Sequence, residues 1–181
     1  MKIMKKATLI FLTLFIVQLC FGQTSIYSFK VDSVSGSHQI DFAAFQGKKI
    51  LIVNTATADS NSYQFAELEE LYQLYKDSLV IVAISSNSFN TEPRTNAEIA
   101  SYCGNNYNLH FPLSAKTEVT GSNADDLYKW LTDKALNTMR STIMHGGFQK
   151  FLINKEGVLV AVFAKKAKPM SQTFRHLIET L

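Results

Sequence analysis

The feature that most constrains the fold of this chain is a pair of continuous apolar runs, at residues 50–53 and 79–84. Such runs are typical of strands that are buried on both faces of a sheet. Between them, residues 63–75 carry apolar side chains at spacings of three and four, which predicts a helix with one buried face. A strand, a helix and a second strand form a βαβ unit, so the two strands should be parallel and joined by a right-handed crossover.

The segments around this unit predict further strands and helices. We expect strands at residues 26–31, 39–42, 148–153 and 158–163 and helices at residues 95–102, at residues 124–136 and from Ser171 onward. Thr95 and Glu98 fit the N-cap and reciprocal capping positions of a helix. Four residues that include Gly157 join the last two strands, which suits an antiparallel hairpin. The pattern predicts an α/β protein with a thioredoxin-like fold, in which helices flank a mixed central sheet.

Residues 1–22 have the pattern of a secretory signal peptide. Three lysines precede an apolar run over residues 7–19, and Gly22 is a small residue at a suitable cleavage site. The run is shorter than the roughly 20 apolar residues that cross the hydrocarbon core of a bilayer. We therefore expect cleavage to leave a single domain of residues 23–181, exported to the periplasm or secreted, with no stable membrane anchor.

The alternatives to a cleaved signal are a transmembrane anchor and a lipoprotein attached through Cys20. The apolar run is too short to favour the anchor. The lipoprotein is disfavoured because Leu19 precedes Cys20, where a lipid-attachment site would prefer a small residue. Both remain as alternatives to a cleaved and released domain.

The charge and the cysteine count of residues 23–181 exclude several classes of function. The formal net charge of +3 equals the charge of the three lysines in the predicted signal, so the remaining domain is neutral. It lacks the clustered basic field that nucleic-acid binding usually needs. The four histidines are dispersed, with no spacing that suggests zinc, and we expect neither a metal nor another cofactor. Cys103 is left as the only thiol, so the domain has no internal disulfide to form.

Five sequence blocks resemble the glutathione peroxidase family. In chain order they read GKKILIVN from Gly47, AELEELY from Ala66, NSFNTEPRTNAEI from Asn87, YCGNNYNLHFPLSAK from Tyr102 and FQKFLINKEG from Phe148. The resemblance covers residues 25–181 and implies a thioredoxin-fold hydroperoxide reductase. In this family a peroxidatic cysteine or selenocysteine follows the first buried parallel strand, at the start of a helix. The partial positive charge of a helix N-terminus lowers the pKa of a thiol and favours the thiolate.

The positions that match the family's catalytic residues are all substituted. Asp59 stands in the peroxidatic position, Ser88 replaces a glutamine, and Gly146 and Gly147 replace a Trp-Asn pair. A carboxylate cannot attack the O–O bond, accept an oxygen atom and be restored by a thiol. The chain is therefore identified as a divergent member without the peroxidatic residue, and no catalytic residue is assigned. Asp59 either stabilises the start of the helix as a cap or dipole partner, or has a binding or acid/base role.

Cys103 is the redox candidate, because it resembles the resolving cysteine of thioredoxin-dependent members. It either packs as a small hydrophobic residue or is a free thiol that oxidises or forms a mixed disulfide with another protein. His145 adjoins the altered site and is a candidate partner for the Asp59 carboxylate. The missing Trp and Asn side chains should also leave a hollow, unless a neighbour such as Phe148 fills it.

These observations lead to one main hypothesis and two alternatives. The main hypothesis is an exported glutathione-peroxidase-family protein without peroxidase activity, a pseudoenzyme that binds a small molecule or another protein through the former active-site pocket. The first alternative is a weak thiol-dependent hydroperoxide reductase of the oxidative-stress response, acting through Cys103 with a thiol redox protein as partner. The second is a structural or interaction module, since a fold does not fix a function.

Overall fold

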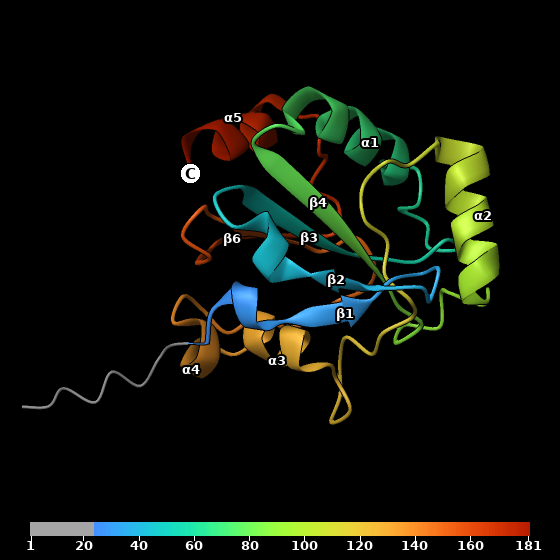
Figure 1. Ribbon diagram of the computed structural model, residues 1–181, viewed down its shortest axis with the longest axis horizontal. Coiled ribbons are helices and arrows are strands. Elements are labelled where there is room, and N and C mark those ends of the chain that lie inside the picture. The colour runs from blue at the N-terminus through green and yellow to red at the C-terminus, as the bar shows by residue number, and fades with distance from the viewer. Residues whose placement is uncertain (1–23) are drawn as a thin grey trace, which may run out of the picture.

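The computed structural model describes residues 24–181, so the predicted signal peptide lies outside the described residues. A four-stranded sheet runs through the centre of the molecule in the order β4-β3-β5-β6 (Figure 1). Its strands are β3 (Lys49–Thr55), β4 (Leu79–Ser85), β5 (Lys150–Ile153) and β6 (Leu159–Phe163). Strand β3 pairs parallel with β4 and antiparallel with β5, and β5 pairs antiparallel with β6. The predicted mixed sheet is confirmed.

Helix α1 (Gln64–Tyr75) connects β3 to β4 and completes the predicted βαβ unit. All seven residues of β4 are buried, and six of the seven residues of β3 are buried, as expected for strands covered on both faces. The register pairs Leu51 with Ile81 and Asn54 with Ile84. Because β3 lies between β4 and β5, the segment that follows it and carries Asp59 starts from an inner strand of the sheet.

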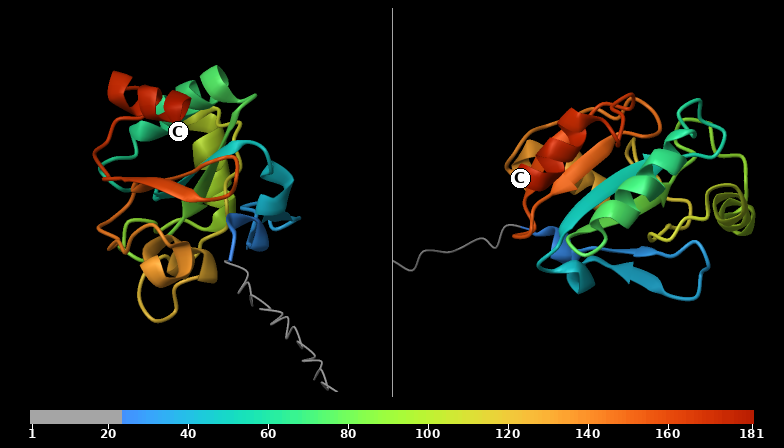
Figure 2. Two further views of the ribbon diagram at one scale, coloured as in Figure 1. Left: turned by 90° about the vertical axis from the view of Figure 1, so that its left-hand side faces the viewer. Right: turned by 90° about the horizontal axis from the view of Figure 1, so that it is seen from above.

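The two faces of the sheet are covered by different elements. Helices α1 and α5 (Gln172–Thr180) cover one face, where Leu68 and Phe174 pack with Leu152 of the sheet (Figure 2). The hairpin of β1 (Lys30–Asp32) and β2 (Gln39–Asp41) lies on the opposite side, with α3 (Asp126–Thr132). There Trp130 and Phe42 belong to the second buried cluster, together with Ile52 of β3.

Helix α2 (Asn96–Tyr107) lies at one side of the sheet, beyond β4 (Figure 1). It has the predicted capping box: the Thr95 hydroxyl accepts a hydrogen bond from the Glu98 backbone N–H, and the Glu98 carboxylate accepts one from the Thr95 backbone N–H. The helix runs five residues beyond the predicted end at Tyr102. It ends where Asn108 adopts a left-handed conformation, with a φ of 49°.

Three predicted elements differ from the structure because short capped turns interrupt them. Residues Ile26–Ser28 form a 3₁₀ turn, η1, whose N-cap Ser25 accepts a hydrogen bond from the Tyr27 N–H, so β1 starts later than predicted. A second 3₁₀ turn, η2 (Phe42–Phe45), follows β2. The helix predicted at residues 124–136 is split into α3 and α4 (Lys134–Asn137), because Asp133 is extended and its side chain caps the second piece.

Within residues 24–181, no helix is long and apolar enough to cross a membrane.

Candidate functional site

Asp59 lies in a turn between β3 and α1. One carboxylate oxygen, Oδ1, accepts hydrogen bonds from the backbone N–H of Asn61 at 2.7 Å and from its side-chain amide at 2.8 Å. Helix α1 begins only at Gln64, and its N-cap, Tyr63, makes no side-chain capping bond. The carboxylate thus stabilises the turn that leads into α1 and does not cap the helix itself.

The loop of Gly146 and Gly147 lies beside this turn and is held by Asn54, at the end of β3. The Asn54 amide donates to the Gly146 carbonyl at 2.8 Å, and its oxygen accepts from the Gln149 N–H at 3.0 Å. The Phe148 N–H donates to the Asn54 carbonyl. Two residues of the loop have left-handed backbones, Gly146 with a φ of 132° and Phe148 with a φ of 65°. A bulky residue such as phenylalanine rarely adopts this conformation, so the loop is locally strained.

Asp59 and Gly147 are brought into direct proximity. A Cβ atom built on Gly147 would lie 2.8 Å from the second carboxylate oxygen of Asp59, Oδ2, and 3.1 Å from its Cγ. The Asp59 carboxylate thus stands where a side chain at position 147 would begin. Phe148 is fully buried and packs edge-on against Phe65, with ring centroids 5.1 Å apart. Beside Gly146, Nζ of Lys165 lies 3.5 Å from the position of an added Cβ atom, so Lys165 and Asp59 fill part of the space next to the two glycines.

The other two candidates are directed elsewhere. The Ser88 hydroxyl donates to the Glu118 carboxylate at 2.7 Å and accepts from the Val119 N–H at 3.0 Å, so it is engaged with the segment before α3. His145 is exposed, and the structure gives no hydrogen bond or ion pair between its ring and Asp59, although both residues are described. The structure therefore joins Asp59 with Gly147 and leaves Ser88 and His145 apart from that contact.

The buried carboxylate of Glu92 stabilises the segment that leads into the Asp59 turn. Glu92 is 1% exposed and accepts hydrogen bonds from the N–H of Thr57 at 2.6 Å and from its hydroxyl at 2.7 Å. The Arg94 guanidinium donates to the Thr57 hydroxyl at 2.6 Å and lies 4.4 Å from the ring centre of Tyr102. Charge-assisted bonds of this kind are about twice as strong as neutral ones. They tie the segment before Asp59 to the start of α2.

Cys103 lies on α2 and is 1% exposed. Burial, and to a lesser degree the nearby Glu92 carboxylate, raise the pKa of its thiol to about 12, although Arg94 acts in the opposite direction. At neutral pH almost none of this thiol is the nucleophilic thiolate.

Lys150 is a buried polar residue near the candidate site. Its ammonium nitrogen donates to the Gln64 side-chain oxygen at 2.6 Å and to the Phe148 carbonyl at 2.8 Å. Burial lowers the pKa of Lys150 to about 7, opposed in part by Glu67. The Gln64 amide in turn donates to the Lys165 carbonyl. This network fixes the start of α1 against β5 and against the segment after β6.

Sequence comparison decides the family. The family model for glutathione peroxidase matches residues 26–132. The chain belongs to the glutathione peroxidase family. It is 33% identical over 147 residues to the glutathione peroxidase homolog BsaA of Bacillus subtilis, covering 80% of this chain and 91% of that protein. It is 35% identical over 150 residues to the glutathione peroxidase-like peroxiredoxin 2 of Saccharomyces cerevisiae, covering 82% and 92%.

Solved structures agree with this assignment. The crystal structure of T. cruzi GPX1 has a TM-score of 0.63 and 26% identity, covering 86% of this chain and 97% of that one. A thioredoxin-family thiol:disulfide interchange protein from Chlorobium tepidum has a TM-score of 0.58 at 16% identity, covering 83% and 89%. The latter shares the fold alone. The predicted glutathione peroxidase resemblance and thioredoxin-like fold are both confirmed.

Several residues around the site were not singled out by the sequence. Lys150 alternates with the apolar residues Phe148 and Leu152 in a predicted strand, and its place on an apolar face could have indicated a buried charge. Glu92 and Arg94 stand in a polar loop that carries no such signal. Residues 24–181 contain no group of three or more His, Cys, Asp or Glu residues that could hold a metal ion.

Proposed function

We propose that this protein is an exported member of the glutathione peroxidase family that does not reduce hydroperoxides and that uses its altered site for binding. The observation that carries the proposal is Asp59, which the family resemblance aligns with the sulfur or selenium nucleophile. A carboxylate has no reversible oxidation cycle that a thiol can complete. The contact between Asp59 and Gly147 further supports the proposal, because it occupies space next to that position.

The buried state of Cys103 also favours this proposal over thiol-dependent catalysis. A reactive cysteine is partly exposed and has a lowered pKa, whereas Cys103 is 1% exposed and its pKa is raised to about 12. Peroxide reduction through Cys103 would require this buried thiol to become accessible and deprotonated. One relative is named as a peroxiredoxin. The peroxidase assay must therefore exclude thiol-dependent reduction through Cys103.

A binding role would use the second oxygen of the Asp59 carboxylate. Oδ1 is committed to Asn61, whereas no hydrogen bond to Oδ2 is found within residues 24–181. Oδ2 is therefore available to accept a hydrogen bond from an N–H or O–H group of a small molecule or of a partner protein. A thermal-shift screen of such small molecules, run in parallel on Asp59→Asn, tests this role: a shift that is equal in both proteins would count against it.

The decisive experiment is a peroxidase assay on the purified domain of residues 23–181. We expect no consumption of hydrogen peroxide or of an organic hydroperoxide, with glutathione or with thioredoxin as reductant. Cys103→Ser is the matched control. Turnover in the wild type that disappears in Cys103→Ser would refute the proposal and establish the thiol-dependent peroxidase instead.

Export is supported by the lysine-rich start and the apolar run of residues 1–22. After expression with the full N-terminus, the intact mass of the protein should correspond to a chain that starts near Gln23. A mass increased by lipid that is lost in Cys20→Ala would indicate the lipoprotein, and a full-length chain in the membrane fraction would contradict cleavage.

A further inference from the structure

A cavity of about 590 Å³ lies between the β1–β2 hairpin, α2 and the segment of residues 109–113. In Figure 1 and in the right-hand view of Figure 2 the tip of the hairpin approaches α2. Small-molecule sites in proteins have volumes of about 300–1,000 Å³, so the cavity is large enough for one. None of Asp59, Ser88, Gly146 and Gly147 lines it. Of the residues described for the candidate site, the cavity shares only Cys103, so its role does not depend on the proposed function.

The walls of the cavity are mostly apolar and come from elements on two sides. The apolar side chains are Val34, Ile40 and Phe45 on the side of the hairpin and Leu109, Phe111 and Leu113 on the opposite side. The polar residues of the lining include His38 and Gln39 near the hairpin tip. Apolar walls with a few polar groups are typical of sites that bind small molecules.

Helix α2 leaves the cavity open because the residues that it contributes are small. These are Ala100, Cys103 and Gly104. Glycine is unfavourable inside a helix, and a Cβ atom built on Gly104 would meet no atom within 4 Å. Glycine at position 104 therefore neither favours the helix nor is required by a close neighbour. The thiol of Cys103 makes no hydrogen bond among the described residues, which suits an apolar wall.

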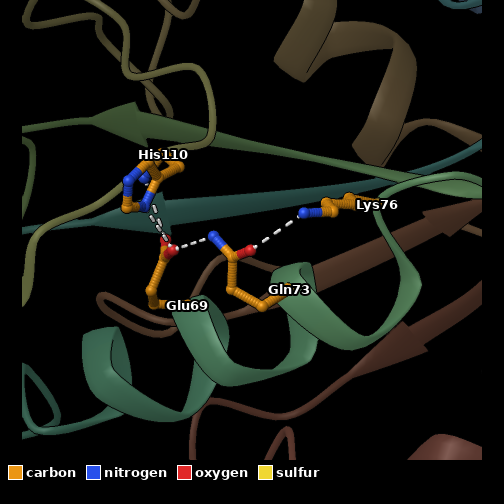
Figure 3. A network of polar contacts seen from close by, with 4 residues as sticks. All are labelled: Glu69, Gln73, Lys76 and His110. Atoms are coloured by element: carbon orange, nitrogen blue, oxygen red, sulfur yellow. Dashed lines mark hydrogen bonds and ion pairs between the residues drawn. The ribbon is translucent and has the colours of Figure 1, made fainter.

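The charged groups of the lining already have partners. The Asp41 carboxylate is paired with Lys30 at 2.7 Å. His110 is paired with Glu69 of α1: the ring Nδ1 and one carboxylate oxygen lie 2.7 Å apart, and the His110 backbone N–H donates to the other oxygen at 2.9 Å (Figure 3). A charged ligand would lose its hydration here without finding a free ion partner, which is unfavourable.

We propose that this cavity binds an uncharged, largely apolar small molecule. Its apolar body would contact the side chains of the hairpin and of residues 109–113, and a hydroxyl or carbonyl group would reach the polar residues at the hairpin tip. The imidazole of His38 offers a ring nitrogen there, because only its Nδ1 is engaged, with the Ser37 hydroxyl.

The test is fluorescence titration of the purified domain with N-phenyl-1-naphthylamine, a neutral aromatic dye. We expect saturable binding to one site. In Ala100→Phe and in Gly104→Phe an added ring enters the cavity, and the affinity should fall by about tenfold or more. Asn105→Phe is the matched control, because Asn105 is exposed on the same helix and does not line the cavity; its affinity should stay within about twofold of the wild type.

The same experiment tests the chemical class of the ligand. 1-Anilinonaphthalene-8-sulfonate has the same aromatic skeleton with an added sulfonate, and we expect it to bind more weakly than the neutral dye. Tighter binding of the sulfonate would overturn the assignment of an uncharged ligand. An equal loss of affinity in Asn105→Phe would overturn the location.

If the phenylalanine variants do not fold, a measurement on the wild type shows whether the dye binds in the cavity. In a ¹H–¹⁵N spectrum, saturating neutral dye should shift the amide signals of Val34, Cys103 and Leu113, which line the cavity from three segments. The amides of α5, which contributes no residue to the lining, should not move. No saturable binding, or shifts confined to residues outside the lining, would refute the proposal.

Discussion

Replacing Gly147 by alanine should destabilise the protein, and the size of the effect should depend on Asp59. The added Cβ would lie 2.8 Å from Oδ2 and 3.1 Å from Cγ of Asp59. The carboxylate cannot move away freely, because Asn61 holds Oδ1 through two hydrogen bonds. Overpacking of this kind lowers the free energy of unfolding by about 1–3 kcal/mol. Replacing glycine also reduces the entropy of the unfolded chain, which raises the free energy of unfolding by about 0.4–1 kcal/mol. We expect a net loss of about 0.5–2 kcal/mol in the free energy of unfolding.

A double-mutant cycle isolates the contact. In an Asp59→Ala background only the Cβ of residue 59 remains, 3.5 Å from the new methyl group, which is an ordinary contact. There Gly147→Ala should stabilise the protein by about 0.4–1 kcal/mol. The interaction energy between the two positions should therefore be about 1–3 kcal/mol.

The assay is equilibrium urea unfolding, followed by the fluorescence of Trp130. This is the single tryptophan of the chain, and it is buried. Gly146→Ala is the control: at a φ of 132° any side chain is strained, so its cost should be equal with and without the Asp59 carboxylate. An interaction energy below about 0.5 kcal/mol, which is the scatter expected of independent sites, would refute the steric coupling.

Three further predictions concern pH, capping and thiol reactivity. Burial lowers the pKa of Lys150 from its usual 10.5 to about 7, so above pH 7 the unfolded chain holds a proton that the folded protein lacks. The contribution of Lys150 to the free energy of unfolding, measured as the difference between wild type and Lys150→Met in parallel urea titrations, should rise by up to about 1.4 kcal/mol per pH unit from about pH 7 toward 10. A difference that does not change with pH would contradict this. Thr95→Ala removes the hydroxyl that accepts from Glu98 and should cost about 1 kcal/mol of stability, measured by thermal unfolding; no change would show that the capping box does not limit stability. Iodoacetamide should alkylate Cys103 at neutral pH far more slowly in the folded than in the urea-unfolded protein, because burial raises the pKa of its thiol to about 12; equal rates would show that α2 opens readily.

The sequence predicts the central βαβ unit well, because burial on both faces leaves a continuous apolar pattern. The runs that predict strands at 50–53 and 79–84 lie within β3 and β4. The errors fall at the short turns. Asp133 is compatible with a helix by composition, yet its extended backbone and its capping bond to the Ala135 N–H divide the predicted helix in two. The break in the helix at Asp133 depends on how the flanking residues pack, so the spacing of apolar residues does not predict it.

At the candidate site, the sequence singles out Asp59 and Gly147 but does not reveal their contact. Asp59 and Gly147 are far apart in the chain, and their proximity follows from the pairing of β3 with β5 and from the Asn54 side chain. The left-handed backbone of Phe148 is also invisible in sequence, because phenylalanine does not favour it. The burial of Cys103 depends on how α2 packs, so the sequence alone leaves both interpretations of this thiol open.

The contact between Asp59 and Gly147 makes one order of sequence changes at these two positions less costly than the other. While the carboxylate is present, any side chain at position 147 meets it at 2.8 Å. A lineage that replaces Asp59 by a smaller residue before it changes Gly147 avoids the overpacking cost of about 1–3 kcal/mol that the opposite order incurs. The cost of a change at position 147 thus depends on which residue already stands at position 59.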